Sequence, residues 1–266
     1  WIWVVKLFCK TLVMLAVRII PSLLLSSGGL VKTTKFSKPK YIGDPINAIK
    51  IFNEKEVDEL ILLDIDSTRL SKKLNFKLIE EIAGECFMPL SYGGGINTLE
   101  DINTILSIGV EKVIINTAAI ENPSFVQSAV EIFGSSTIVI SIDYKNTFFK
   151  KPSIYTKNGS FSQKIEPLFF AKKMQELGVG EIMFNSIERD GTMSGFDTNF
   201  IKKAVDSLSI PVIACGGAGN LKHLKELIKN KSISAIAAGS LFVYYGPNKG
   251  ILINYPSYKS LENILN

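Results

Sequence analysis

Carboxylates at the ends of apolar runs are the side chains best placed for chemistry in this chain of 266 residues. Asp143 ends the run IVISID, and both Asp64 and Asp66 lie at the end of LILLDID. A carboxylate at the open end of a strand can act as a general acid or base. The alternative for Asp143 is a strand-end cap. Of Asp64 and Asp66, one could take no part in chemistry and simply orient Lys32 or Arg69.

Glycine-rich turns follow several of the same runs and predict phosphate binding. Gly93-Gly94-Gly95 and Asn116-Thr117 offer backbone N–H groups and a hydroxyl, and glycine lets the backbone approach a ligand closely. Similar turns return later in the chain, which favours a long ligand with a phosphate at each end. Tight turns also require glycine, so this alternative stays open. The later turns are Gly216-Gly217, Gly239-Ser240 and Arg189-Asp190-Gly191-Thr192.

Few other side chains compete for a catalytic role. Ser22 and Asn185 are weaker candidates, because either could simply line the site. His223 is the single histidine and falls in a predicted helix, so histidine catalysis and histidine-rich metal sites are not expected. We expect no metal and no cofactor.

Composition favours one domain that acts on a small anionic ligand. The formal charge of +5 comes from scattered lysines, which suits a phosphorylated small molecule better than nucleic acid. The cysteines are sparse and have neither metal-ligand nor CxxC spacing, and Cys215 is best interpreted as a buried thiol. A reducing cytoplasm is the simplest location. The three cysteines are Cys9, Cys86 and Cys215.

The first 13 residues, WIWVVKLFCKTLV, are apolar but are interrupted by Lys6 and Lys10. No uninterrupted run reaches the roughly 20 residues needed to cross a bilayer, so no membrane association is predicted. We expect residues 1–13 to be a dispensable extension, with the natural start at Met14 and the folded domain over residues 14–266.

Eight short β-type runs alternate with segments that have helical spacing and start signals, which predicts a single (βα)8 TIM barrel. Asp44-Pro45 and Asn122-Pro123 are two such start signals. The barrel would be of the phosphate-binding, ribulose-phosphate type, with its site at the carboxyl ends of the strands. The runs are VRIIPSLL from Val17 to Leu24, LILLDID, MPLSYG, KVIINT, IVISID, EIMFNS, PVIACG and SAIAAG.

The two halves of the chain resemble each other, which predicts a duplicated half-barrel. Pro89-Leu90, Gly94-Gly95 and Asn116-Thr117 are echoed at one constant spacing by Pro211-Val212, Gly216-Gly217 and Ala238-Gly239. The first and fifth runs also align, and this pairs Ser22 with Ser141 and Leu24 with Asp143.

Four charges fall at the starts of predicted strands, where apolar residues would be expected. They would form a ring at the amino-terminal end of the barrel that plugs or gates its interior. A purely structural ring of paired charges is the alternative. The four are Arg18, Glu59, Lys112 and Glu181.

From Met14 onward the chain resembles the HisF family, the cyclase subunits of imidazole glycerol phosphate synthase. The motifs that carry the resemblance include RIIPSLL, YGGGI, EKVIINTAAIENP, GEIMFNSIERDGTMSGFD and PVIACGGAGNLKHL. The resemblance implies a HisH-like glutaminase on the amino-terminal face, with ammonia passing the four-charge gate. It also implies ligand contacts from Lys32, Gly95, Asn116, Thr117, Asp190, Gly191, Gly217 and Ser240; the turns add Gly94, Gly216 and Gly239, and Asp64 lies beside them.

One catalytic position departs from the family pattern. HisF enzymes place an Asp at the end of the first and of the fifth strand, whereas this chain has Leu24 and Asp143. Leucine cannot transfer a proton, and losing one acid or base typically lowers the rate by roughly 10²- to 10⁴-fold.

With RIIPSLLL and KPKYIGDP, the chain is similar to the HisF paralogues linked to acetamidino modification of bacterial surface sugars, which implies ammonia supply to a third, amidotransferase subunit. The alternatives are a true histidine-pathway cyclase in which another carboxylate such as Asp64 replaces the lost one, and a noncatalytic ammonia conduit. A HisA-like isomerase would leave the charge ring without a purpose.

Overall fold

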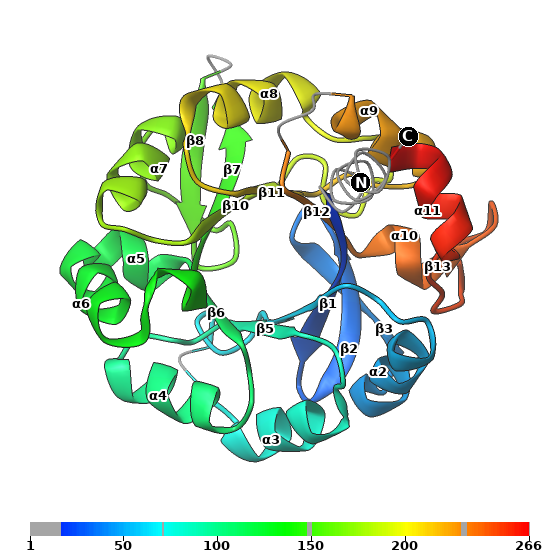
Figure 1. Cartoon of the computed structure of the whole chain (residues 1–266), viewed down its shortest axis with the longest axis horizontal. Helices are drawn as coiled ribbons and strands as arrows, with labels where there is room; N and C mark the ends of the chain where they lie inside the picture. The colour runs from blue at the N-terminus through cyan, green and yellow to red at the C-terminus, as the bar shows by residue number, and fades with distance from the viewer. Residues whose placement is uncertain (1–16, 71, 148–150, 230–232, 266) are drawn as a thin grey trace, which may run out of the picture.

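Eight parallel strands close into a barrel in the computed structural model, which describes residues 17–70, 72–147, 151–229 and 233–265. The barrel closes because β1 pairs with both β12 and β4, in parallel register. Figure 1 shows the closed ring of strands surrounded by helices. The predicted TIM barrel is therefore confirmed. Its strands are β1 (Arg18–Ser26), β4 (Leu60–Asp64), β5 (Leu90–Gly93), β6 (Lys112–Ile115), β7 (Ile138–Asn146), β10 (Glu181–Ser186), β11 (Val212–Cys215) and β12 (Ala235–Ala238).

Helices cover the outside of the barrel, and side-chain caps fix where they begin. The predicted starts are confirmed, since Asp44 caps α2 and Asn122 caps α6, each with proline at the first helical position. The helices are α2 (Pro45–Glu54), α3 (Phe76–Glu85), α4 (Leu99–Ser107), α5 (Thr117–Glu121), α6 (Pro123–Phe133), α7 (Pro167–Glu176), α8 (Thr198–Ser207), α9 (Leu221–Ile228), α10 (Ser240–Val243) and α11 (Tyr258–Leu265), with a 3₁₀ turn, η1, over Ser135–Thr137. Over the described ranges, no helix has the length and apolarity to cross a bilayer.

Two apolar cores are separated by the sheet. The larger one packs the outer face of the strands against the helices. The smaller one fills the inside of the barrel with mostly aliphatic side chains, so the space between the two ends of the barrel is apolar. This interior core consists of Ile20, Ile61, Ile114, Val139, Met183, Ile213, Cys215, Ala235 and Ala237.

Antiparallel hairpins extend β1 and β7 beyond the barrel at its carboxyl-terminal end. After β1 come β2 (Gly29–Thr34) and β3 (Ser37–Gly43), and after β7 come β8 (Pro152–Thr156) and β9 (Phe161–Ser162). A short hairpin of β13 (Tyr244–Tyr245) and β14 (Gly250–Ile251) lies near the C-terminus. The two long hairpins follow strands that the duplication pairs, so the pseudo-twofold relation extends to them.

The first strand differs slightly from its prediction. The sequence run ends at Leu24, whereas β1 continues to Ser26, because Leu24, Leu25 and Ser26 pair with β2. Residues 1–13 and the predicted start at Met14 lie outside the described ranges.

We expect opposite effects from alanine at two glycines remote from the barrel mouth. A Cβ at Gly180 would lie 2.2 Å from the carbonyl oxygen of Ser135, whereas a Cβ at Gly84 in α3 meets nothing within 4 Å. Gly180→Ala should lower the free energy of unfolding by about 1–3 kcal/mol. Gly84→Ala should raise it by about 0.5 kcal/mol because alanine favours the helix. Chemical denaturation of both variants measures this, and equal effects would contradict the packing at Gly180.

Candidate active site

A cavity of about 670 Å³ opens at the carboxyl-terminal ends of the barrel strands. It is where a TIM barrel holds its ligand. Asp143, Leu24, Ser22 and Asn185 line it, so strand ends far apart in sequence meet there. The structure also brings every predicted ligand-contacting residue to its wall: Lys32, Asp64, Gly94, Gly95, Asn116, Thr117, Asp190, Gly191, Gly216, Gly217, Gly239 and Ser240.

The paired glycine turns have matching backbone conformations. The φ angles are +108° at Gly94 and +76° at Gly95, and +88° and +113° at Gly216 and Gly217. A Cβ at Gly94 would lie 2.1 Å from the carbonyl oxygen of Asp64, so no side chain fits there. Glycine is therefore required by both conformation and space, and each turn leaves its backbone accessible to a ligand.

The short helices behind these turns are also equivalent, with one correction to the sequence alignment. Asn116 caps α5 at φ −118° and ψ −85°, and Gly239 caps α10 at φ −108° and ψ −66°. The structural mates of Asn116-Thr117 are therefore Gly239-Ser240, one residue later than the echo at Ala238-Gly239. The Ser240 hydroxyl is buried and has no hydrogen-bond partner within the described part of the chain, as expected of a group that awaits a ligand.

Lys32 brings a buried positive charge to the second of these turns. It lies on β2, only 4% exposed, and a Cβ at Gly239 would meet its Nζ atom. Among the described residues its ammonium group has no ion-pair partner, although buried charges are normally paired. An anion bound between Lys32 and Ser240 would supply the missing negative charge.

Asp143 is the carboxyl group best suited to proton transfer. Burial, and next the negative charge of Asp190, raise the pKa of Asp143 to about 7, while hydrogen bonding by Asn185 and Ser141 opposes the rise. Asn116 donates to its Oδ2 atom at 3.3 Å and to the carbonyl oxygen of Ser141 at 2.9 Å. Asn116 thus holds the carboxyl group, and Asp143 can exchange a proton near neutral pH.

Leu24 occupies the position symmetry-related to Asp143, at the point where β1 enters its hairpin. Asp64, at the end of the neighbouring strand β4, and Asp66, in the loop after it, both have hydrogen-bond partners within the protein. Asp64 accepts from the backbone N–H groups of Asp66 and Ser67 and from the Ser67 hydroxyl. Asp66 pairs with Arg69 at 2.8 Å, so the predicted orienting role is confirmed for that residue.

Asp190 is a further carboxylate of the cavity wall and is only 8% exposed. Its Oδ2 atom accepts from the hydroxyl of Thr33 on β2 at 3.0 Å, and its carbonyl oxygen accepts from the backbone N–H of Lys35 at 2.8 Å. The first hairpin is therefore fastened to the β10–α8 loop across the cavity, and this contact keeps Lys32 in place.

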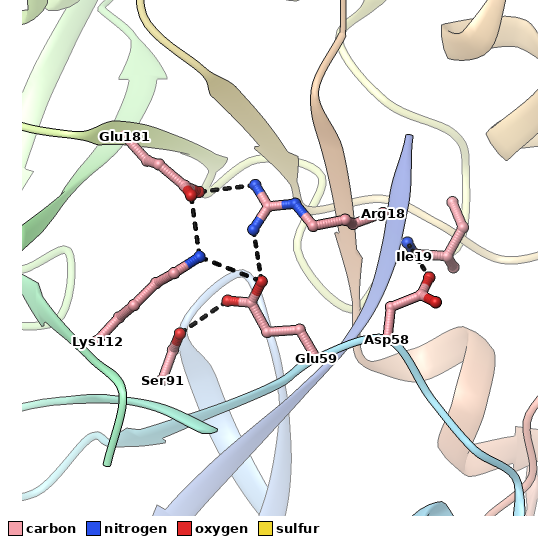
Figure 2. Close-up of polar contacts among 7 residues, drawn as sticks. All are labelled: Arg18, Ile19, Asp58, Glu59, Ser91, Lys112 and Glu181. Atoms are coloured by element: carbon pink, nitrogen blue, oxygen red, sulfur yellow. Dashed lines mark hydrogen bonds and ion pairs between the residues drawn. The ribbon is translucent and has the colours of Figure 1, made fainter. Parts of the chain in front are cut away.

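The four predicted charges form a closed cycle at the opposite end of the barrel (Figure 2). Arg18 binds Glu59 at 2.5 Å and Glu181 at 2.8 Å, and Lys112 binds Glu181 at 2.9 Å and Glu59 at 3.4 Å. Burial alone would raise the pKa of Glu181, but its hydrogen bonds and attraction to Arg18 and Lys112 lower it below the usual range. The predicted ring is present and closes the amino-terminal end of the apolar interior.

Sequence reasoning missed the side chains that hold this ring. The Ser91 hydroxyl donates to Glu59 Oε1 at 2.8 Å, which leaves Glu59 Oε2 to the two cations (Figure 2). Ile19, the residue after Arg18, is held by two side chains. Its backbone N–H donates to the Asp58 carboxylate at 3.3 Å, and the carbonyl oxygen of Ile19 accepts from the Tyr255 hydroxyl at 2.8 Å. A serine in an otherwise apolar strand was the available signal for Ser91, whereas nothing local marks Tyr255.

The remaining candidates have structural roles. Burial raises the pKa of Cys215 to about 12, so its thiol stays protonated. His223 lies on α9 and accepts from the backbone N–H of Gly219 at 3.2 Å, outside the lining of the cavity. In the described ranges no three His, Cys, Asp or Glu side chains gather as a metal site would require.

Replacing Asp143 should stabilise the fold in a pH-dependent way. Because the folded pKa is raised, ionisation costs stability as the pH rises from the ordinary Asp value to about 7. The melting temperature of Asp143→Asn should exceed that of the wild type by a few degrees at pH 8 and by little at pH 4. Asp206→Asn, at an exposed carboxylate paired with Lys202, is the control. A constant difference across this range would contradict the raised pKa.

Breaking the ring should cost far more than breaking a surface ion pair. Arg18→Met leaves two largely buried glutamates with one lysine, so we expect a loss of about 3 kcal/mol in the free energy of unfolding. Lys202→Met removes an exposed pair with Asp206 and should cost under about 1 kcal/mol. Urea denaturation at pH 7 compares them, and similar losses would argue against a tightly coupled ring.

Comparison with known proteins agrees with this geometry. The model of the histidine biosynthesis protein family matches residues 18–247, which span all eight barrel strands. Over 92% of the chain, it is 53% identical to a Pseudomonas aeruginosa protein provisionally named imidazole glycerol phosphate synthase subunit hisF2, and the match covers 98% of that protein.

Two further relatives carry similar provisional names. The HisF subunit of Leptospira interrogans is 49% identical, with 94% of this chain and 98% of that protein covered. Subunit hisF3 of Vibrio vulnificus is 46% identical, with 92% and 94% covered. The family match extends over nearly the whole barrel, and the identity to these relatives is high. The chain therefore belongs to the histidine biosynthesis protein family, among its HisF-type members.

Proposed function

We propose that this chain is the synthase-type subunit of a glutamine amidotransferase complex and receives ammonia through its barrel from a HisH-like glutaminase. The observation that carries the proposal is the closed charge ring, which stands at one end of an apolar barrel interior whose other end is the candidate active site. A gate of this kind would admit neutral ammonia on opening and would exclude ions, because an apolar interior disfavours them.

The ligand at the carboxyl-terminal end is a phosphorylated small molecule. Two symmetry-related turns, at Gly94-Gly95 and Gly216-Gly217, support a phosphate at each end of it. Lys32 adds a charge that no protein group among the described residues neutralises. Between the two turns lies Asp143, which can donate a proton to an oxygen of the ligand or accept one from the incoming nitrogen.

Leu24 favours acetamidino modification of a surface-polysaccharide sugar over imidazole formation. The reaction of ammonia with a carbonyl group and the closure of a ring need several proton transfers, and only one carboxyl group of the expected pair is present. A subunit that still passes ammonia can deliver it to a third, amidotransferase subunit in the cytoplasm. Asp143 would then serve a shorter reaction or none.

The cyclase subunit of imidazole glycerol phosphate synthase is the alternative, and the names of the relatives support it. A noncatalytic ammonia conduit is a second alternative that Leu24 favours. The three proposals differ in their dependence on Asp143. The cyclase requires it, the conduit does not, and all three require the charge ring.

Turnover by the purified chain from Met14 tests these proposals. It would be supplied with the bisphosphate substrate of imidazole glycerol phosphate synthase and excess ammonium salt at alkaline pH. We expect binding without imidazole glycerol phosphate formation. Turnover at an ordinary enzyme rate, lost in Asp143→Asn, would establish the cyclase instead, and so would complementation of a histidine auxotroph.

Lys32 should dominate the affinity for the phosphorylated ligand. We expect Lys32→Met to weaken binding of the same bisphosphate about ten-fold or more, because a buried charge-assisted hydrogen bond is lost. Lys40→Met is the matched control, since Lys40 is the β3 residue that pairs with Lys32 in the same hairpin but is exposed. Isothermal titration calorimetry measures both, and equal affinities would remove Lys32 from the phosphate site.

A further inference from the structure

An exposed aromatic side chain lies at the end of the barrel that carries the charge ring. Phe87, in the loop between α3 and β5, is 84% exposed and is the most exposed large hydrophobic residue in the described ranges. A phenylalanine offers a large apolar surface, so this side chain is available for contact with a partner protein. Its loop joins the end of a helix to the start of a strand, and therefore lies at the amino-terminal end of the barrel with the charge ring.

The loop that carries Phe87 is held in one conformation. The side-chain amide of Asn53 in α2 donates to the carbonyl oxygen of Glu85 at 2.7 Å and accepts from the backbone N–H of Phe87 at 3.1 Å. These two bonds clamp the loop from both sides of Cys86. A loop whose backbone is already ordered loses less entropy on binding, which suits a loop that carries an anchor residue of an interface.

The strand that follows connects this loop directly to the ring. Ser91, four residues after Phe87, bonds Glu59, and four residues of strand span on the order of 13 Å. On one side the backbone N–H of Leu60 donates to the carbonyl oxygen of Pro89 at 2.9 Å. On the other side, the backbone N–H of Glu111 donates to the carbonyl oxygen of Leu90 at 2.9 Å. A protein bound at Phe87 would therefore reach the entrance of the barrel.

Acidic residues flank Phe87 on the neighbouring loops. Glu54, Glu56 and Asp58 are exposed at the end of α2 and before β4, and Glu111 is exposed before β6. Lys55 is the basic residue among them. This sector is therefore negative although the whole chain carries a formal charge of +5. The charge pattern fits a partner surface with basic side chains around an apolar pocket.

We propose that Phe87 is the anchor residue for the glutaminase subunit, seated in an apolar pocket that lysine or arginine residues of the glutaminase border. This inference rests on the proposed function, because it takes the glutaminase as the occupant. It adds which residue carries the affinity and what chemistry the partner surface has. The two Asn53 hydrogen bonds keep the backbone of the loop ordered before the partner arrives.

Direct binding to a separately purified HisH-type glutaminase of the same organism tests the proposal, with each such glutaminase assayed in turn by calorimetry. We expect Phe87→Asp to weaken binding at least ten-fold and Phe87→Ala to do so by a similar factor. Phe161→Asp, at a 60% exposed phenylalanine on β9 at the opposite end, should bind as the wild type does. Melting temperatures of the variants confirm that each is folded.

Charge and preorganisation have their own variants. Glu56→Lys should slow association and Lys55→Glu should speed it, and both effects should shrink at high salt. Asn53→Ala should weaken binding several-fold with Phe87 still present. If the wild type binds a glutaminase and the Phe87 variants bind equally well, the anchor is wrong while the proposed function stands. If the wild type binds no glutaminase, the proposed function itself fails, and this inference with it.

Discussion

The hydrogen-bonded closure of β1 against β12 is the constraint on which the rest of the structure depends. Because the eight strands are parallel, closing the sheet brings all their carboxyl ends to one mouth of the barrel and all their amino ends to the other. One mouth collects glycine turns, Lys32 and Asp143, and the other collects four charges. Neither group is contiguous in the sequence, and both exist only because the first strand meets the last.

Closure also separates the two electrostatic environments. The interior core between the mouths is aliphatic, so charges at either end are poorly solvated on one side. At the amino-terminal end the chain solves this problem by alternating two cations with two anions in a closed cycle. At the carboxyl-terminal end it leaves Lys32 without an ionic partner among the described residues and keeps Asp143 near its protonation midpoint at neutral pH. The charges at the first end balance one another, whereas Lys32 at the second end has no such balance from the described residues.

The internal duplication shows where the two halves of the barrel differ. Turns, short helices and hairpins keep their symmetry, because each half needs the same backbone geometry to complete the barrel. The side chains at the symmetry-related positions of Leu24 and Asp143 do not. Since β1 and β7 enter their hairpins in the same way, the fold accommodates a leucine at one of these positions and a carboxyl group at the other.

Much of this protein could be predicted from the sequence, because strand and helix periodicity, proline-preceded caps and glycine turns are local signals. The barrel, its duplication, the ring of four charges and the glycine turns of the cavity wall follow from such patterns, whereas Lys32 was expected there only from the family resemblance. The tertiary structure alone decided which partners these residues have. The Asp64 carboxylate accepts from the Ser67 hydroxyl, and Glu59 accepts from that of Ser91. Asn53 accepts from the backbone N–H of Phe87, and the hydroxyl of Thr33 joins the first hairpin to Asp190. Each contact joins different elements or depends on the exact path of a loop, and spacing along the chain carries no information about either.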